Sequence, residues 1–192
     1  MAVFHTKTFK KHDDYMTPFY AWKNIEKYLP KDKVIWEAFY GNGKSGTHLK
    51  RLGCKTIHYD IDFFENNLGD CVVSNPPFSK SKQILERLVF LDKPFILILP
   101  CSKLTTQYFR KLFAENKDQI QIIIPRRRIH FKKMKIENGV YKEIEGWGDR
   151  CNFDCFYYCW KMNLPRDMVF LIDEEKGGLL TTQSPKLFSK KS

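Results

Sequence analysis

The segment SNPPF, residues 74–78, directly follows the short apolar run CVV and combines residue types that can hold a planar ligand. Asn75 offers a side-chain oxygen as a hydrogen-bond acceptor. Pro76 and Pro77 fix the direction of a neighbouring carbonyl group, because proline restricts φ. The ring of Phe78 can stack on a flat aromatic group. The same letters also suit a turn that ends a strand, so both interpretations stay open.

A second segment, VIWEAFYGNGKSG at residues 34–46, fits two nucleotide-binding patterns at once. Residues 38–45 read A-x-x-x-x-G-K-S, a relaxed phosphate-binding P-loop in which Lys44 would hold phosphate. Residues 37–43 read E-x-F-x-G-x-G, which resembles the strand-to-helix loop of S-adenosylmethionine (SAM) methyltransferases. Asp60, after the next apolar run, suits both patterns, either as a Mg²⁺ ligand or as an acceptor for ribose hydroxyls.

The elements around these segments alternate between strand and helix. Apolar runs predict strands at VIW, KTIHYD, CVVS, FILILP and IQIIIP, and helical spacing predicts helices near residues 18–29, 45–52, 80–90 and 104–116. Thr17 is placed to cap the first helix and Pro18 to open it. This alternation predicts a doubly wound, Rossmann-like α/β sheet, mostly parallel, with ligands at the carboxyl ends of its strands. FDCFYYCWKM, which no helix precedes, is predicted as an antiparallel edge strand.

Position favours the methyltransferase interpretation, because SNPPF follows the glycine loop at the end of a later strand. N-P-P-F resembles motif IV of the amino-methyltransferases, and DYMTP ahead of the loop is similar to motif X of the group that carries a SAM-binding Thr-Pro there. Over residues 14–161, the order of these segments is similar to that of gamma-type, N6-adenine-specific DNA methyltransferases. The SAM-binding set that the resemblance implies consists of Tyr15, Thr17, Pro18, Glu37, Phe39, Gly41, Gly43, Asp60, Asp62 and Phe63.

Two departures from the family pattern affect these assignments. Ala38 stands where the family often has Pro, and only about fifteen residues separate Asp60 from Asn75. Because this spacing is too short for the usual helix and strand, we expect the segment DIDFF to combine two roles. Asp60 would bind the ribose of SAM, and Asp62 with Phe63 would contact its adenine.

The resemblance also implies the chemistry of the site. The exocyclic amino nitrogen of a base is a poor nucleophile, because its lone pair is delocalised into the ring. If Asn75 Oδ1 and the Pro76 carbonyl each accept one amino hydrogen, the lone pair turns toward the methyl group of SAM. Pro77 would keep this geometry. Phe78 would stack on a base that is flipped out of a duplex or already single-stranded. No metal is required.

The formal net charge of +11 favours a polyanionic partner. Basic residues gather in an insert at residues 125–152 that has no regular helix or strand pattern, where gamma-type enzymes place their target-recognition region. We expect nucleic acid as the partner, DNA being favoured over RNA, with salt-dependent phosphate contacts. The residues expected to make these contacts are Arg126, Arg127, Arg128, Lys132, Lys133 and Lys135.

Length and composition predict the organisation of the chain. The 192 residues suit one domain over residues 15–172, with a flexible basic arm at 1–14 and a mobile tail at 173–192. Without a membrane-spanning apolar run or a visible secretory signal, we expect a soluble intracellular protein of the cytoplasm or nucleus, in a form that would suit a phage or virus. The six cysteines, among them Cys151, are expected to be free thiols.

Other functions stay open at this point. An RNA base methyltransferase, acting on adenine N6 or guanine N2, would use the same NPPF chemistry. A P-loop NTPase and a catalytically silent nucleic-acid-binding relative are further alternatives. Binding of SAM separates these last two from a methyltransferase, because only a methyltransferase retains it.

Overall fold

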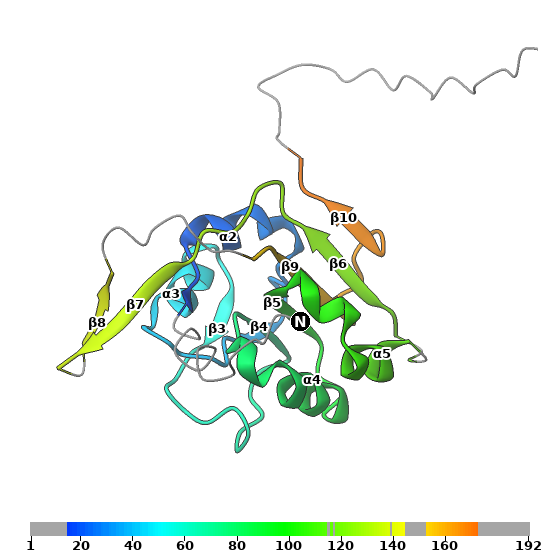
Figure 1. Ribbon diagram of the computed structural model, residues 1–192, viewed down its shortest axis with the longest axis horizontal. Helices are drawn as coiled ribbons and strands as arrows, with labels where there is room; N and C mark the ends of the chain where they lie inside the picture. Colours follow the sequence, from blue (N-terminus) through cyan, green and yellow to red (C-terminus); the bar gives the residue numbers. More distant parts are fainter. Residues whose placement is uncertain (1–14, 115, 117, 139, 145–152, 173–192) are drawn as a thin grey trace, which may run out of the picture.

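The computed structural model describes residues 15–114, 116, 118–138, 140–144 and 153–172. Within these residues, seven strands form one mixed sheet (Figure 1). From one edge to the other, its strands are β10 (Met168–Phe170), β6 (Ile120–Ile124), β9 (Cys155–Trp160), β5 (Phe95–Pro100), β4 (Cys71–Ser74), β2 (Val34–Trp36) and β3 (Lys55–Ile57). All of them except β9 run in the same direction. The predicted doubly wound, mostly parallel α/β sheet is confirmed.

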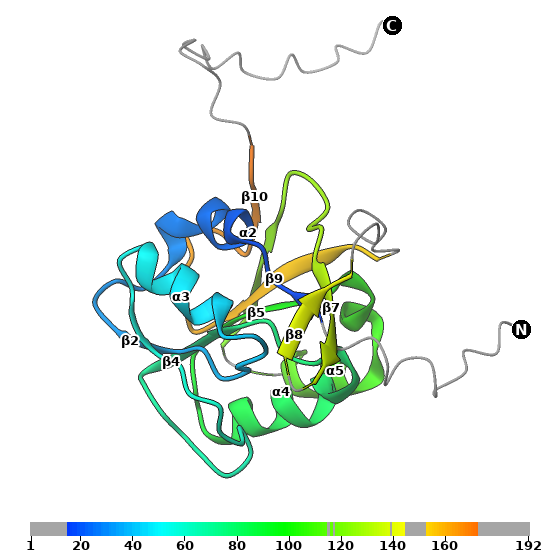
Figure 2. The ribbon, with the colours of Figure 1, turned by 90° about the vertical axis from the view of Figure 1, so that its left-hand side faces the viewer.

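Helices cover both faces of this sheet (Figures 1 and 2). Helices α2 (Phe19–Asn24) and α3 (Lys44–Arg51) lie on one face, and α4 (Ser81–Phe90) and α5 (Gln107–Phe113) lie on the other. Short 3-10 helices are η1 (Glu26–Tyr28), η2 (Phe78–Lys80) and η3 (Cys101–Thr105). With helices on both sides, every residue of β4 and β5 is buried, as the continuous apolar runs CVV and FILILP require.

The chain reverses its path across the sheet between β2 and β4. From β2 it passes outward through α3 to the edge strand β3, and it then returns to β4 on the other side of β2. The loops that follow β2 and β4 therefore diverge, and a crevice opens between them at the carboxyl ends of the strands. The two segments singled out in the sequence, residues 37–43 and 75–78, begin at this crevice.

Strand β9 is antiparallel, as predicted, but it lies inside the sheet and not at its edge. It pairs with β5 on one side and with β6 on the other. An interior place explains its aromatic sequence, because Tyr157, Tyr158 and Trp160 become fully buried there. The buried hydroxyl of Tyr157 donates to the Ala21 carbonyl (2.6 Å), and that of Tyr158 donates to the Pro100 carbonyl (2.9 Å).

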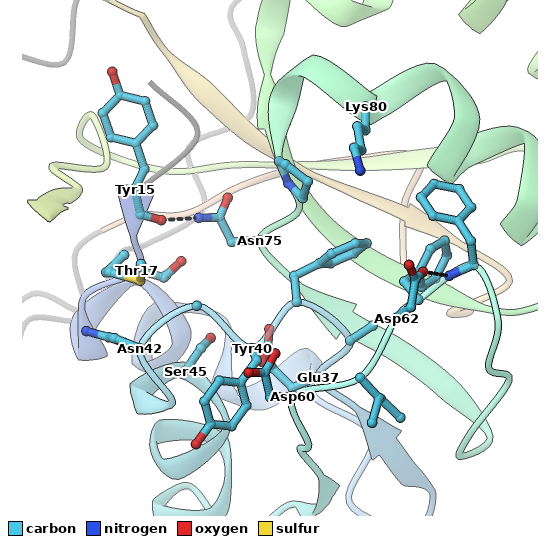
Figure 3. Close-up of a pocket in the computed structure, with 18 residues that line it drawn as sticks. Tyr15, Thr17, Glu37, Tyr40, Asn42, Ser45, Asp60, Asp62, Asn75 and Lys80 are labelled. Carbon is cyan, nitrogen blue, oxygen red and sulfur yellow. Dashed lines mark hydrogen bonds between the residues drawn. The ribbon is translucent and has the colours of Figure 1, made fainter. Parts of the chain in front are cut away.

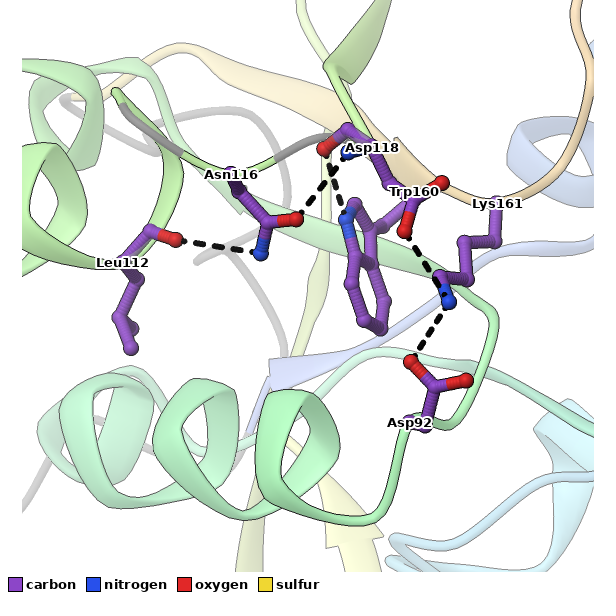
Figure 4. A network of polar contacts seen from close by, with 6 residues as sticks. All are labelled: Asp92, Leu112, Asn116, Asp118, Trp160 and Lys161. Atoms are coloured by element: carbon purple, nitrogen blue, oxygen red, sulfur yellow. Dashed lines mark hydrogen bonds and ion pairs between the residues drawn. The ribbon is translucent and has the colours of Figure 1, made fainter.

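A polar network fixes the last residue of β9, Trp160, where the neighbouring strands β5 and β6 begin (Figure 4). Trp160 Nε1 donates to the Asp118 carbonyl at 3.0 Å. Lys161 Nζ lies 2.6 Å from Asp92 Oδ1 and 3.0 Å from Asp118 Oδ2. Asn116 Oδ1 accepts the Asp118 N–H at 3.1 Å and closes the turn before β6. Lys161 thereby ties the loop after α4 to the loop before β6.

A smaller antiparallel sheet, also within the described residues, joins the basic insert to the start of the chain. Its strands are β1 (Tyr15–Met16), β7 (Lys132–Glu137) and β8 (Val140–Glu143). The β7–β8 hairpin projects from the body of the protein (Figure 1). The prediction of an insert without regular structure is therefore wrong for this part. The sequence did contain a signal for this hairpin, because the dipeptide Asn-Gly at positions 138 and 139 is favoured in two-residue hairpin turns. In the structure, Asn138 has the positive φ, +53°, that such a turn requires.

Several predictions fall partly outside the described residues. These include the arm at 1–14, the tail at 173–192 and Cys151. The described cysteines, Cys54, Cys71, Cys101, Cys155 and Cys159, are free thiols as expected. No helix among the described residues has the length and apolar character that crossing a membrane requires.

Candidate active site

A pocket of about 540 Å³ lies in the crevice at the carboxyl ends of the strands (Figure 3). Its lining comes from within four segments, residues 15–17, 37–45, 60–64 and 75–80. The predicted cofactor-binding and catalytic residues that line it are Tyr15, Thr17, Glu37, Phe39, Gly41, Asp60, Asp62, Phe63, Asn75 and Pro77. The fold therefore gathers most of the predicted site in one place, although these residues are up to 62 positions apart in the sequence.

Four predicted site residues do not line the pocket: Pro18, Gly43, Pro76 and Phe78. Pro18 immediately precedes α2, and Gly43 immediately precedes α3 with a φ of +80°, which favours glycine. Both residues shape the backbone at a helix start. Pro76 is buried next to the lining residues Asn75 and Pro77. These three residues can position the site, and direct contact with a ligand stays a prediction for them.

The side chain of Asn75 has a fixed orientation. Its Nδ2 donates to the Tyr15 carbonyl oxygen at 2.9 Å (Figure 3). Because a carbonyl oxygen can only accept, the amide nitrogen must face Tyr15, and Oδ1 must point the other way. Asn75 Oδ1 is buried and has no hydrogen-bond partner among the described residues. A buried acceptor in this state is ready to receive a donor from a ligand.

Phe78 packs in an aromatic cluster next to this contact. Its ring is 8% exposed, stacks on Tyr15 with 6.3 Å between centroids, and meets Phe131 and Phe153 edge-on at 6.2 and 5.6 Å. The predicted stacking of Phe78 on a base is not offered by this arrangement, because the residue is buried among three aromatic side chains and does not line the pocket. The geometry instead gives Phe78 a positioning role: it supports Tyr15, whose carbonyl group orients Asn75.

Thr17 lies at the start of α2 and differs from its prediction. The structure gives α2 no side-chain cap, and its N-cap residue is Pro18. Thr17 is 5% exposed, lines the pocket, and its Oγ1 has no hydrogen-bond partner among the described residues. The capping role is therefore wrong. Together with Asn75 Oδ1, the Thr17 hydroxyl is a second buried polar atom of the pocket that a ligand can satisfy.

Glu37 is held by two side chains beneath the glycine loop. It is fully buried, its Oε1 accepts a hydrogen bond from Ser74 Oγ, and its Oε2 lies 2.9 Å from His58 Nε2. The predicted contact of Glu37 with the ammonium group of SAM has to compete with these partners. The observed contacts instead connect the ends of β2, β3 and β4, so that Glu37 fixes the relative positions of the pocket loops.

His58 is a residue of the site that the sequence prediction missed. Its side chain is 6% exposed and stacks on Tyr40 with 4.6 Å between ring centroids. A Cβ atom placed on Gly46 would lie 2.1 Å from His58 Nδ1, so the imidazole occupies space that any other residue at position 46 would need. The signal in the sequence was weak, because a single His after KTI has no marker of burial.

The pKa of Glu37 gives a testable pH dependence. Burial raises the pKa of this carboxyl group above its ordinary value of 4.5, although His58 and Ser74 oppose the shift. The folded protein then keeps this proton at a pH where the unfolded chain has lost it. The free energy of unfolding that this group contributes is therefore largest below pH 4.5 and falls as the pH rises through the folded pKa.

Replacing Glu37 with Gln removes this titration. As the pH rises from 4.5, the unfolding free energy of the wild type should fall relative to that of Glu37→Gln. The reason is that the folded wild type must bury an increasingly ionised carboxylate, whereas Gln stays neutral. Urea unfolding at a series of pH values measures this difference. A difference that stays constant over the series would contradict the assignment.

The remaining lining residues give the pocket its charge and its apolar wall. Asp60 and Asp62 are exposed at the pocket, and Asp62 Oδ1 accepts the Phe64 N–H at 2.6 Å, which shapes the turn. Phe63 is buried against Trp36, with 5.5 Å between ring centroids. Lys80 is the cation of the lining among the described residues.

Lys44, the residue on which the P-loop interpretation depends, lies outside the pocket. It is the first residue of α3, its side chain is exposed, and it does not belong to the lining. Its backbone N–H is accepted by Asn42 Oδ1 at 3.1 Å. Since a P-loop lysine must reach the phosphates that its loop encloses, this position disfavours phosphate binding by Lys44.

The predicted phosphate-binding residues separate into three groups. Arg126 and Arg127 follow β6 and are exposed beside α2. Arg128 forms a two-pronged ion pair with Asp154, with 2.8 and 3.2 Å between the paired atoms, and so closes the base of the insert. Lys132, Lys133 and Lys135 belong to β7, in which Lys133 pairs with Tyr15 of β1. The β7 lysines therefore lie on a strand next to the pocket.

Comparison with known proteins adds no family assignment. No family model matches the chain, and no curated protein matches it.

Proposed function

We propose that the protein transfers a methyl group from SAM to the exocyclic N6 amino group of adenine in DNA. The observation that carries this proposal is the state of Asn75 Oδ1. This acceptor is buried and has no hydrogen-bond partner within the described part of the chain, and it belongs to a residue that lines the pocket and whose amide is fixed by its contact with Tyr15. An amino group can supply the missing donor.

The residues of the pocket fit SAM. A volume of about 540 Å³ is in the range of small-molecule sites. Asp60 would accept hydrogen bonds from the ribose hydroxyls, Asp62 and Phe63 would contact the adenine, and the orphaned Thr17 hydroxyl would contact the methionine part. When bound, SAM supplies a methyl group that is attached to a positively charged sulfur. The sulfur leaves readily, because it becomes a neutral thioether.

Charge supports SAM over a nucleoside triphosphate. Within the described residues, the lining contains the exposed carboxylates of Asp60 and Asp62 against one cation, Lys80. The buried Glu37 is already held by Ser74 and His58 and does not enter this balance. Carboxylates at close range repel a polyphosphate and attract a sulfonium or ammonium group. With Lys44 outside the lining, the pocket offers little to hold phosphate.

The protein's part in the reaction is to orient the amino nitrogen. Asn75 Oδ1 accepts one amino hydrogen, and the Pro76 carbonyl is the expected second acceptor, so that the lone pair faces the methyl donor. The Tyr15 carbonyl keeps the Asn75 amide from rotating, and this contact exists before substrate binds. Because the Asn75 amide is already fixed by this contact, it needs little reorganisation when the base enters.

The test is a direct assay with methyl-labelled SAM. The full chain is incubated separately with DNA and RNA pools, the nucleic acids are digested to nucleosides, and the labelled base is identified by mass spectrometry. Label on N6 of adenine in DNA supports the proposal. Label only in RNA, on adenine N6 or guanine N2, would replace the substrate, and a protein that retains no SAM would refute the proposal.

Replacing Lys44 with Ala separates the two interpretations of the glycine loop. We expect an unchanged dissociation constant for SAM, because the Lys44 side chain is exposed and does not line the pocket. Equilibrium dialysis with labelled SAM and with labelled ATP measures both affinities. Tight ATP binding by the wild type that the Lys44→Ala variant loses would identify a P-loop protein instead.

A further inference from the structure

A second groove, of about 800 Å³, lies between α2 and β10. Both elements stand at the same end of the molecule in the two ribbon views (Figures 1 and 2). The start of α2 contributes to both sites, since Thr17 lines the pocket and Tyr20 lines the groove. Tyr20 also connects the groove to the basic insert, because its hydroxyl accepts the His130 N–H at 2.7 Å. The groove is thus next to the proposed active site but separate from it.

The groove is strongly basic. Its cations are Lys23, Lys27, Arg126 and Arg127, and its one carboxylate within the described residues is Glu26, which pairs with Lys23. Lys23 belongs to α2, Lys27 to η1, and the two arginines follow β6. This balance leaves a surplus of positive charge that suits the phosphates of a polyanion.

One wall of the groove comes from α2 and η1. Tyr20, Lys23 and Asn24 stand at positions i, i+3 and i+4 of α2, which lie on one face of an α-helix, and Glu26 and Lys27 follow in η1. The two lysines therefore line the same wall in sequence order. Charges in a row can contact successive phosphates of an extended chain.

Apolar side chains lie exposed on the opposite wall. Phe170 is 64% exposed and Ile172 is 76% exposed, and Tyr20 across the groove is 40% exposed. Phe170 pairs through its backbone with Ile124, at the point where β6 ends and Pro125 leads to the arginines. An exposed aromatic ring beside several cations is the combination with which proteins bind single-stranded nucleic acid, since bases stack on the ring while the cations contact the backbone.

We infer that this groove binds a single-stranded segment of nucleic acid that flanks the target base, with Phe170 as a stacking surface. A duplex hides the faces of its bases, so it would use the cations and leave Phe170 unoccupied. That this nucleic acid is the methylation substrate rests on the proposed function. Its binding in the groove does not depend on the proposed function.

The test measures binding of fluorescein-labelled oligonucleotides by anisotropy, without SAM. One variant, Lys27→Gln with Arg127→Gln, removes two groove charges, and its control, Lys50→Gln with Lys111→Gln, removes two exposed charges elsewhere. The groove variant should lower the slope of log affinity against log salt by about 1.4 for a single strand. Its control should behave as wild type.

A second pair of variants tests the stacking surface. Phe170→Ser should weaken binding of a single strand roughly five- to hundredfold and leave binding of the matched duplex unchanged. Phe90→Ser is its control, because Phe90 is 85% exposed at the end of α4, outside the groove. Equal losses for Phe170→Ser and Phe90→Ser, or equal losses for single strand and duplex, would overturn the inference.

The two proposals fail in different ways. If the groove variants weaken single-strand binding but no nucleic acid receives a methyl group, the groove inference stands and the proposed function fails. If methyl transfer occurs and the groove variants change neither binding nor the KM for a long oligonucleotide, the groove inference fails alone.

Discussion

Replacing Asn75 with Asp is expected to lower kcat for methyl transfer by about a hundred- to a thousandfold, the usual effect of removing one preorganised hydrogen bond. The reason lies in the contact with Tyr15. Asn75 Nδ2 donates to the Tyr15 carbonyl at 2.9 Å, and a carboxylate cannot donate. The introduced carboxylate would be repelled by that carbonyl and would turn, so the oxygen that receives the amino hydrogen would no longer be held in place.

The affinity for SAM separates this effect from a general disturbance of the pocket. We expect the dissociation constant of SAM to stay near the wild-type value, because the Asn75 contact orients the base and the assigned cofactor contacts come from other segments. Single-turnover kinetics and equilibrium dialysis measure the two quantities. Asn67→Asp is the matched control, since Asn67 is exposed and outside the lining. A kcat close to wild type would remove Asn75 from the mechanism.

The sheet and the place of the pocket follow from local patterns. FILILP and CVVS have the length and apolar character of strands that are buried on both faces, and the structure places β5 and β4 there. Because chemical residues follow these runs, their convergence at the carboxyl ends is a consequence of the fold class. Asp60 and Asn75 meet in the pocket for this reason.

Long-range pairing is what local patterns leave undetermined. CFYYCW predicts a strand, but its place between β5 and β6 depends on partners that are distant in the sequence. The same applies to β1, which becomes a strand only because β7 pairs with it. That pairing carries the Tyr15 carbonyl to Asn75. The contact that orients the proposed catalytic amide was therefore invisible in the sequence.

The pairing also suggests how the insert relates to the site. Lys132 and Lys133 of β7 pair with Met16 and Tyr15 of β1. A phosphate that binds these lysines would contact β7, which pairs with β1, and the Tyr15 carbonyl of β1 accepts the hydrogen bond of the Asn75 amide. The small sheet is therefore a physical connection between the expected nucleic-acid contacts and the pocket.

Replacing Gly46 with Ala is expected to destabilise the protein by about 1 to 3 kcal/mol, the usual cost of overfilling a packed interior. The new Cβ would lie 2.1 Å from His58 Nδ1 and 2.2 Å from its Cγ, so the imidazole ring has to move. The ring has little room, because it lies between Tyr40 and Glu37. Its displacement would also release Glu37, and with it the glycine loop.

The decisive measurement is the same substitution in a His58→Gly background. The three nearest atoms to the new Cβ, at 2.1, 2.2 and 2.7 Å, are the Nδ1, Cγ and Cβ of His58, and glycine at position 58 removes all three. Ala is favoured over Gly within a helix by roughly 0.5 to 1 kcal/mol. Gly46→Ala should therefore destabilise the wild type and stabilise His58→Gly, a reversal of sign that urea unfolding of the four proteins can measure. An equal effect in both backgrounds would show that His58 does not fill the space above Gly46. If the sign does reverse, the requirement for glycine at position 46 comes from the imidazole that fixes Glu37 and not from close approach of a cofactor.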